Sequence, residues 1–142
     1  MKEFDDWIPP LIPEDEYELK FEGYTTGFLF GRTPKLILDF KIISSNEHFG
    51  TKITSYYNVQ RIIGKPGKNG NFKVGWSSRF AREFMSLFNT RVTRLDRFPM
   101  SRFERSILIG KTKTVKKSAN QKNLPSVAQY SVVNELVKLK EI

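Results

Sequence analysis

The sequence lacks cysteine, contains a single histidine and has no long uninterrupted hydrophobic run. Without cysteine, a disulfide framework and thiolate metal sites are excluded, and a reducing compartment is compatible with the composition. His48 has no second metal-ligating residue type suitably spaced near it, which argues against a metal site or a histidine general base. No segment approaches the ~20 apolar residues that span a bilayer. The acidic N-terminal residues contain no apolar secretion-signal core, so we expect a cytoplasmic protein without a membrane role.

The charge of the chain is large and unevenly distributed. The formal net charge is +9, yet residues 1–19 carry a net charge of −6 and residues 20–142 a net charge of +15. A basic body suits a polyanionic partner, because each phosphate neutralised by Lys or Arg releases condensed counterions. The alternative is a soluble protein that is basic without a nucleic-acid partner.

The length of 142 residues fits one domain. We expect residues 1–13 to form an acidic arm and residues 14–142 to form the folded domain. Pro9, Pro10 and Pro13 exclude a helix or a central strand in the arm.

Three segments near the start of the domain alternate apolar and polar residues with a period of two, as half-buried strands do. They cover residues 17–30, 36–43 and 52–59. Short turns between them predict an antiparallel meander. Gly23 interrupts the first segment, which predicts a bulge or a bend there.

Helical spacing appears after Trp76. Apolar residues recur at helical intervals from Phe80 to Phe88, Ser77 or Ser78 can cap the start, and Asn89 can end the helix. A capping-box pattern at residues 101–104 predicts a second, shorter helix.

The last third of the domain predicts two more strands. Residues 111–117 favour a strand, and residues 118–128 a mobile loop. Residues 130–139 fit either a strand or a short helix, and two adjacent valines favour the strand.

This order of elements predicts a mostly β fold, a five-stranded OB-fold-like barrel with a helix between strands 3 and 4. Such barrels bind oligonucleotides on the face of strands 2 and 3 and on the loops joining strands 1 to 2 and 4 to 5. A bend at Gly23 suits a first strand that serves both sides of such a barrel.

The outward face of the second and third predicted strands combines cations with one ring. Sequence-tolerant binding of a single strand needs this combination, because charge neutralises phosphates and rings stack on bases. Tyr56 is the first choice for stacking, although it can equally be an ordinary strand former at a sheet edge. The candidates on this face are Lys35, Lys41, Lys52, Tyr56 and Asn58.

Two further basic segments are expected beside the same groove. Residues 60–76 interleave glycines, cations and rings, and we interpret them as a flexible loop that approaches phosphates, with packing of the rings as the alternative. Its candidates are Arg61, Lys65, Lys68, Phe72, Lys73 and Trp76. The fourth strand supplies Lys111, Lys113, Lys116 and Lys117.

An arginine cluster, residues 91–105, either extends this track or forms a solvated face paired with Asp96 and Glu104; we prefer the second interpretation.

Catalytic motifs are sparse. Asp39 and Lys41 have the acid-x-Lys spacing of some metal-dependent nucleases, and Glu22 or Glu47 can complete it, but such short matches arise often by chance. The glycines and lysines of residues 64–68 lack the spacing of a phosphate-binding P-loop. We therefore predict a protein that is not an enzyme and needs no cofactor or metal.

The layout resembles the small single-stranded-DNA-binding-like proteins of phages, plasmids and integrated mobile elements. The resemblance covers residues 12–139 and is carried by residues 12–19, 36–42 and 49–53, by the helix ending near Asn89, and by Ile109-Gly110-Lys111 before the fourth strand. It implies an OB-fold that coats or guards single strands during DNA replication or recombination.

The expected function is thus single-stranded DNA binding with little sequence preference. The alternatives are a basic β-barrel module that binds RNA or an acidic protein, and third a metal-dependent nuclease. The acidic residues 1–16, with Phe4 and Trp7, either recruit replication or recombination proteins or fold back into the basic groove as a strand mimic. Homo-oligomerisation, DNA-versus-RNA choice and site size stay open.

Overall fold

The computed structural model describes residues 8–29, 31–117 and 122–140. Phe4, Trp7 and the three acids of residues 1–7, and residues 118–121 of the expected loop, lie outside the described residues. In chain order the elements are β1 (Glu16–Leu29), β2 (Thr33–Ile42), β3 (Lys52–Asn58), β4 (Arg61–Ile63), β5 (Gly67–Lys68), β6 (Asn71–Lys73), α1 (Arg79–Phe88), α2 (Ser101–Glu104), β7 (Ile107–Val115), the short 3-10 helix Ser126–Ala128 and β8 (Tyr130–Leu139).

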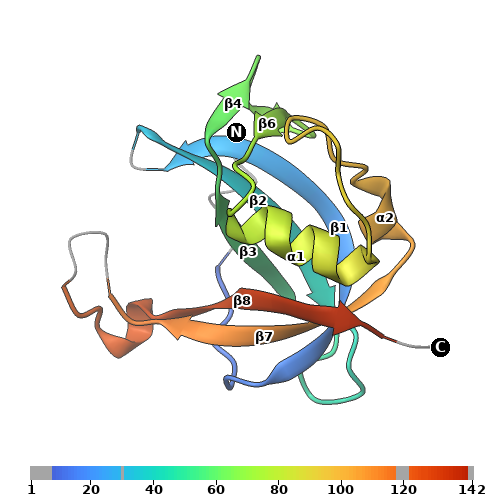
Figure 1. The fold of residues 1–142 in the computed structure, drawn as a ribbon. Helices are drawn as coiled ribbons and strands as arrows, with labels where there is room; N and C mark the ends of the chain where they lie inside the picture. Colours follow the sequence, from blue (N-terminus) through green and yellow to red (C-terminus); the bar gives the residue numbers. More distant parts are fainter. Residues whose placement is uncertain (1–7, 30, 118–121, 141–142) are drawn as a thin grey trace.

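The main sheet is antiparallel and has six strands. Five follow the order β3-β2-β1-β7-β8, and the sixth, β5, pairs with β1. β1 holds this sheet together, because its first residues pair with β7 and its later ones with β2 and β5 (Figure 1). The register shifts between Phe21 and Gly23, and Gly23 takes a φ of 150°, so the predicted bulge is confirmed.

The sheet is not closed into a barrel. β3 and β8 face each other without a ladder, and side chains satisfy the backbone of β8 instead. The Ser55 hydroxyl donates to the Val133 carbonyl oxygen at 2.9 Å, and the Leu136 N–H donates to Glu83 Oε1 at 3.3 Å. The expected five-stranded barrel is thus replaced by an open sheet whose two end strands are joined by polar side chains.

Arg79 and Glu83 form a partly buried ion pair at this junction. Arg79 donates to the Ser55 hydroxyl at 2.9 Å, lies 3.9 Å from the centre of the Tyr57 ring and makes an ion pair with Glu83. Glu83 also accepts the Tyr57 hydroxyl proton at 2.7 Å. Burial raises the pKa of the Glu83 carboxyl, and the bonds from Tyr57 and Arg79 partly offset this rise.

The predicted helices form, with one difference. Ser78 accepts from the Ala81 N–H at 3.1 Å and Asn89 adopts the left-handed conformation, as expected at the two ends of α1. α2 occurs at residues 101–104, but the expected capping box is wrong. Its N-cap is Met100, which makes no side-chain capping bond, and Ser101 accepts from Arg105 instead.

Residues 60–75 are not the flexible loop that their composition predicts. β4 and β6 form a two-stranded sheet at the top of Figure 1, and β5 pairs with β1. Gly70 lies so close to β1 that a Cβ there would fall 2.1 Å from Thr26 Oγ1. Close packing against the protein's own backbone and side chains thus explains why position 70 is a glycine.

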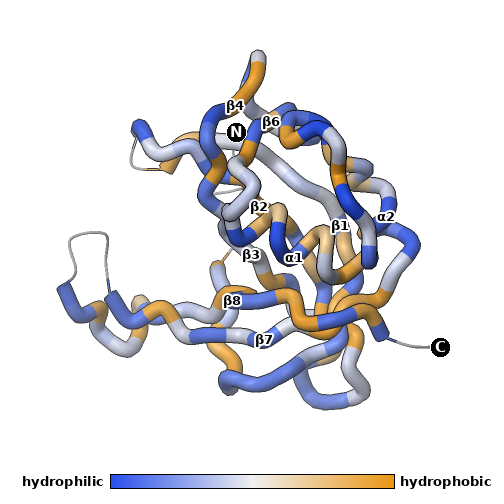
Figure 2. Tube along the Cα trace, in the orientation of Figure 1, coloured by the Kyte–Doolittle hydropathy of each residue, from blue (hydrophilic) through white to orange (hydrophobic). Residues whose placement is uncertain are grey.

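The core is rich in phenylalanine. The inward residues of β2, namely Leu36, Leu38, Phe40 and Ile42, are fully buried, as their alternation predicts. Figure 2 shows hydrophobic and hydrophilic residues alternating along the strands and along α1, whose apolar side packs against the sheet. Rings from α1, β6 and the segment before α2 form one cluster, in which Phe80 contacts Phe72, Phe84 and Phe98 at centroid distances of 5.0–6.0 Å.

Candidate nucleic-acid interface

The outward faces of β1, β2, β3 and β5 form one surface, which we call the sheet face. Opposite residues of an antiparallel ladder point to the same side. Lys68, Thr25, Ile37 and Tyr56 are successive partners across β5, β1, β2 and β3. The prediction that Tyr56 points away from the core is confirmed, because Tyr56 is half-buried whereas its neighbour Tyr57 is 1% exposed.

Cations flank Tyr56 on both sides along the strands. Lys35 is opposite Asn58 and donates to its side-chain oxygen, and Lys41 is opposite Lys52. Burial, and to a smaller extent the charge of Arg79, lower the pKa of the Lys35 ammonium. The sheet face therefore carries positive charge at either end of a central ring.

Asp39 is the acidic exception on this face. It is opposite Thr54, between the Lys35 and Lys41 positions. Burial raises the pKa of its carboxyl, Glu22 raises it further, and Lys52 partly offsets both effects. A carboxylate here opposes the binding of phosphates, so Asp39 weakens an otherwise basic surface.

A second ring joins the sheet face from β8. Tyr130 is the first residue of β8, and burial together with the neighbouring Tyr56 raises the pKa of its hydroxyl. Lys113 and Val115 on β7 are opposite Val132 and Tyr130, so Lys113 lies on the same side as the Tyr130 ring. The β7–β8 hairpin thus adds a ring and a cation to the surface around Tyr56.

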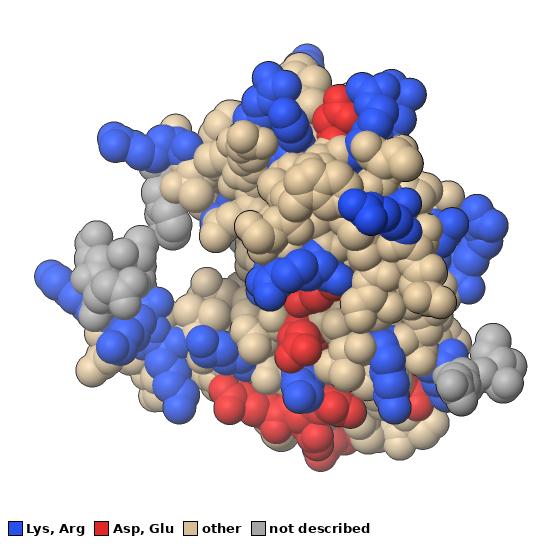
Figure 3. Space-filling view, viewed as in Figure 1, with Lys and Arg blue, Asp and Glu red and all other residues tan. Residues whose placement is uncertain are grey.

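Two hairpins border a hollow next to this surface. Figure 3 shows Lys and Arg side chains on both arms of the hollow at the left of the molecule, the end of the β1–β2 hairpin and the end of the β7–β8 hairpin. Lys116 and Lys117 are exposed on the second arm, and Arg32 on the first. Phe28, which is 51% exposed, also belongs to the β1–β2 hairpin.

The predicted site residues divide into those near the sheet face and those elsewhere. Lys35, Lys41, Lys52, Tyr56, Asn58 and Lys68 share it, and Lys113, Lys116 and Lys117 lie on the adjoining hairpin. Lys111 does not extend the basic surface, because Glu16 and Glu135 are its partners on either side and offset its charge.

Phe72, which the sequence predicts to be a nucleic-acid-binding residue of a flexible loop, is buried instead. It is 5% exposed, and its ring stacks on Phe98 with a centroid distance of 5.9 Å and an interplanar angle of 15°. It is therefore a core residue of the β4–β6 sheet and cannot stack on a base in this structure.

The other candidates of residues 60–76 are distributed around the β4–β6 sheet. Arg61 and Lys73 are opposite each other in it, and Lys65 is exposed in the turn between β4 and β5. Trp76 is 52% exposed before α1, with the Arg91 guanidinium 5.7 Å from its ring centre. Arg61 and Lys73 thus belong to a separate two-stranded sheet, and strand pairing does not bring them into the sheet face.

The arginine cluster is largely a solvated face. Arg91, Arg94, Arg97 and Arg105 are exposed, and Arg94 donates two hydrogen bonds to Asp96 at 2.8 and 3.0 Å. The expected partner Glu104 makes no ion pair within the described part of the chain.

The described ranges contain no group of three or more His, Cys, Asp or Glu side chains placed to hold a metal ion. Glu22 is close enough to Asp39 to raise the pKa of its carboxyl, as the nuclease alternative requires. The His48 side chain makes an edge contact with the Tyr17 ring and approaches Glu47 at 4.0 Å. Within these same ranges no helix is long and apolar enough to cross a membrane.

The end of the acidic arm is part of the fold. Ile12 is 7% exposed, its N–H donates to Ser131 Oγ at 2.9 Å, and the Ser131 N–H donates to the Pro10 carbonyl oxygen at 2.7 Å. Asp15 likewise bonds to Thr112 through its backbone. The packed domain therefore starts a few residues before the predicted boundary at residue 14. Pro10 lies next to Ser131, which follows Tyr130 in β8.

Sequence reasoning missed Tyr130, Phe28 and Arg32. The signals for Phe28 and Arg32 were an aromatic residue and a cation at a turn between two strands. Tyr130 carries no local signal, because only the pairing of β8 with β7 and its junction with β3 bring it near Tyr56.

Comparisons of the chain with protein-family models, curated proteins and solved structures found no match.

Proposed function

We propose that this protein is an OB-fold-like single-stranded-DNA-binding protein with little sequence preference, acting in DNA replication or recombination. The order β3-β2-β1-β7-β8, the bend in β1 and the position of α1 between β3 and β7 support this interpretation. An OB-fold is a partly open barrel, which agrees with a sheet whose end strands meet only through side chains.

The observation that carries the proposal is the position of Tyr56. It lies between Lys35 and Lys52 along the sheet face. Lys68 lies on the same line of ladder partners across the strands, and Tyr130 lies beside Tyr56. Bases that stack on these rings would place their phosphates near the lysines, and neither contact depends on base identity. The hollow between the two basic hairpins carries Lys and Arg side chains on both of its arms (Figure 3).

Titration of a labelled oligo(dT) strand and of a duplex of equal length, at several salt concentrations, tests the proposal. We expect tighter binding of the single strand, with affinity falling as salt rises, because counterions are released from the neutralised phosphates. Lys52→Gln should reduce the slope of log affinity against log salt by ~0.7, the value for one phosphate contact on a single strand.

Lys138→Gln is the matched control. It removes the same charge near the C-terminal end of β8, whereas Tyr130 lies at the N-terminal end. The two residues are eight positions apart, about 26 Å along the strand. The slope of Lys138→Gln should equal that of the wild type. Equal effects of the two variants would mean that net charge, and not the sheet face, determines binding.

A further inference from the structure

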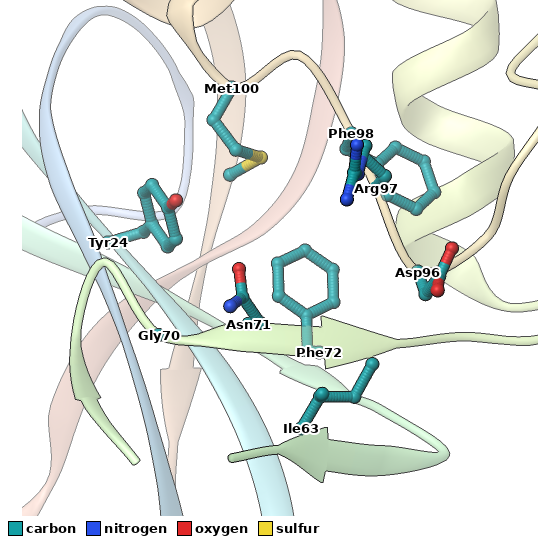
Figure 4. A pocket seen from close by; sticks show the side chains of 9 residues that line it. All are labelled: Tyr24, Ile63, Gly70, Asn71, Phe72, Asp96, Arg97, Phe98 and Met100. Carbon is teal, nitrogen blue, oxygen red and sulfur yellow. The ribbon is translucent and has the colours of Figure 1, made fainter. Parts of the chain in front are cut away.

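A cavity outside the sheet face lies between β1, the β4–β6 sheet and the segment that leads into α2. Its volume is ≈180 Å³, and its walls include Tyr24, Asn71, Arg97, Phe98 and Met100. Figure 4 shows these side chains arranged around a common opening. An apolar cavity of about 150 Å³ holds a benzene-sized ring. The space is therefore large enough for one planar heterocycle.

Aromatic rings form part of the walls, and the core holds these rings in place. On one side the nearly parallel rings of Phe72 and Phe98 pack against Phe80. On the other side the Tyr24 ring stacks on Phe21 with an interplanar angle of 26°. Because these rings are fixed by the core, the cavity is preformed.

Three polar groups face the opening without a partner. The Tyr24 hydroxyl, the Asn71 amide and the Arg97 guanidinium make no side-chain hydrogen bond to any residue within the described ranges. An amide offers a donor beside an acceptor, which matches the edge of a base, and a guanidinium suits a phosphate. The carboxylate of Asp96 also lines the cavity, but both of its oxygens accept hydrogen bonds from Arg94.

We propose that this cavity binds one nucleobase together with its 5′-phosphate. The base lies between the Tyr24 and Phe98 walls, Asn71 pairs with its edge, and Arg97 binds the phosphate at the opening. The nucleotide is either an unstacked residue of a bound strand or a free mononucleotide, and both present the same chemistry to the cavity. The first source rests on the proposed single-strand binding, whereas the second does not.

The test is calorimetric titration of the full chain with dAMP, dCMP, dGMP and dTMP in turn, followed by titration with the labelled oligo(dT). We expect saturable binding of at least one mononucleotide. Asn71→Ala and Arg97→Gln should each weaken it about tenfold, in line with the loss of one well-formed polar pair to a base or phosphate. Arg105→Gln, which changes an exposed arginine outside the cavity lining, should leave it unchanged.

The outcomes separate this inference from the proposed function. If oligo(dT) binds with the expected salt dependence, but no mononucleotide binds and Asn71→Ala leaves oligonucleotide affinity unchanged, the cavity is not a nucleotide site and the proposed function stands. If a mononucleotide binds and oligo(dT) does not, single-strand binding is wrong and the cavity is a site for free nucleotides. Asn71 is exposed, so its variant should keep the wild-type unfolding temperature.

Discussion

Tyr56→Ala should weaken the binding of single-stranded DNA without changing its salt dependence. Stacking on an aromatic side chain contributes ~1–3 kcal/mol per base. Tyr56 is half-buried beside Tyr130, so only part of its ring can meet a base. We therefore expect a loss of about 1 to 2 kcal/mol, which corresponds to about 5- to 30-fold in the dissociation constant. No charge is removed, so the slope of log affinity against log salt should stay the same.

The assay is fluorescence anisotropy with labelled oligo(dT), and Tyr56→Phe is the matched control. Phenylalanine keeps the stacking ring and removes only the hydroxyl, so its affinity should stay close to that of the wild type. Thermal unfolding of each variant checks that the sheet is intact. Wild-type affinity of Tyr56→Ala in a folded protein would refute stacking at this position. An equal loss in both variants would assign the effect to the hydroxyl instead.

Other predictions concern charge, packing and the arm. Asp39→Asn should tighten oligo(dT) binding about fivefold at neutral pH, since it removes a like charge near the phosphates. The Asp39 pKa is raised in the fold, so any stability gain from this variant should appear above that pKa and vanish in acid, which unfolding temperatures against pH will test. Gly70→Ala should lower the free energy of unfolding by about 1–3 kcal/mol through the clash with Thr26, whereas Gly75→Ala, with open space around it, should not; urea unfolding distinguishes them. Deleting residues 1–7 should tighten single-strand binding if the acidic arm competes for the groove, and unchanged affinity in the same titration would exclude competition.

Local sequence patterns were sufficient to predict much of the sheet. The period-two pattern of β2 and β3 assigns Leu38 and Tyr57 to the core and Tyr56 to the surface, because side chains of a strand alternate between its faces. The bulge at Gly23 and the ends of α1 are also encoded by single residues with strong conformational preferences.

The positions of residues that depend on pairing between distant segments could not be predicted from local patterns. Phe72 looks like an exposed loop residue until β4 pairs with β6 and places its ring against Phe80. Lys68 joins the row of Tyr56 only through the two-residue pairing of β5 with β1. Lys111 looks equivalent to Lys113 in the sequence, and only the register with β1 and β8 gives it acidic neighbours.

The most direct test of the central claim is to map the amides whose NMR signals shift when oligo(dT) is added to the labelled protein. A chain of 16.6 kDa is well suited to this measurement. We predict that the largest shifts cluster on β2, β3 and the outer part of the β7–β8 hairpin, around Tyr56 and Tyr130. Shifts confined to α1, α2 and the arginine cluster would contradict the assignment of the sheet face as the binding surface.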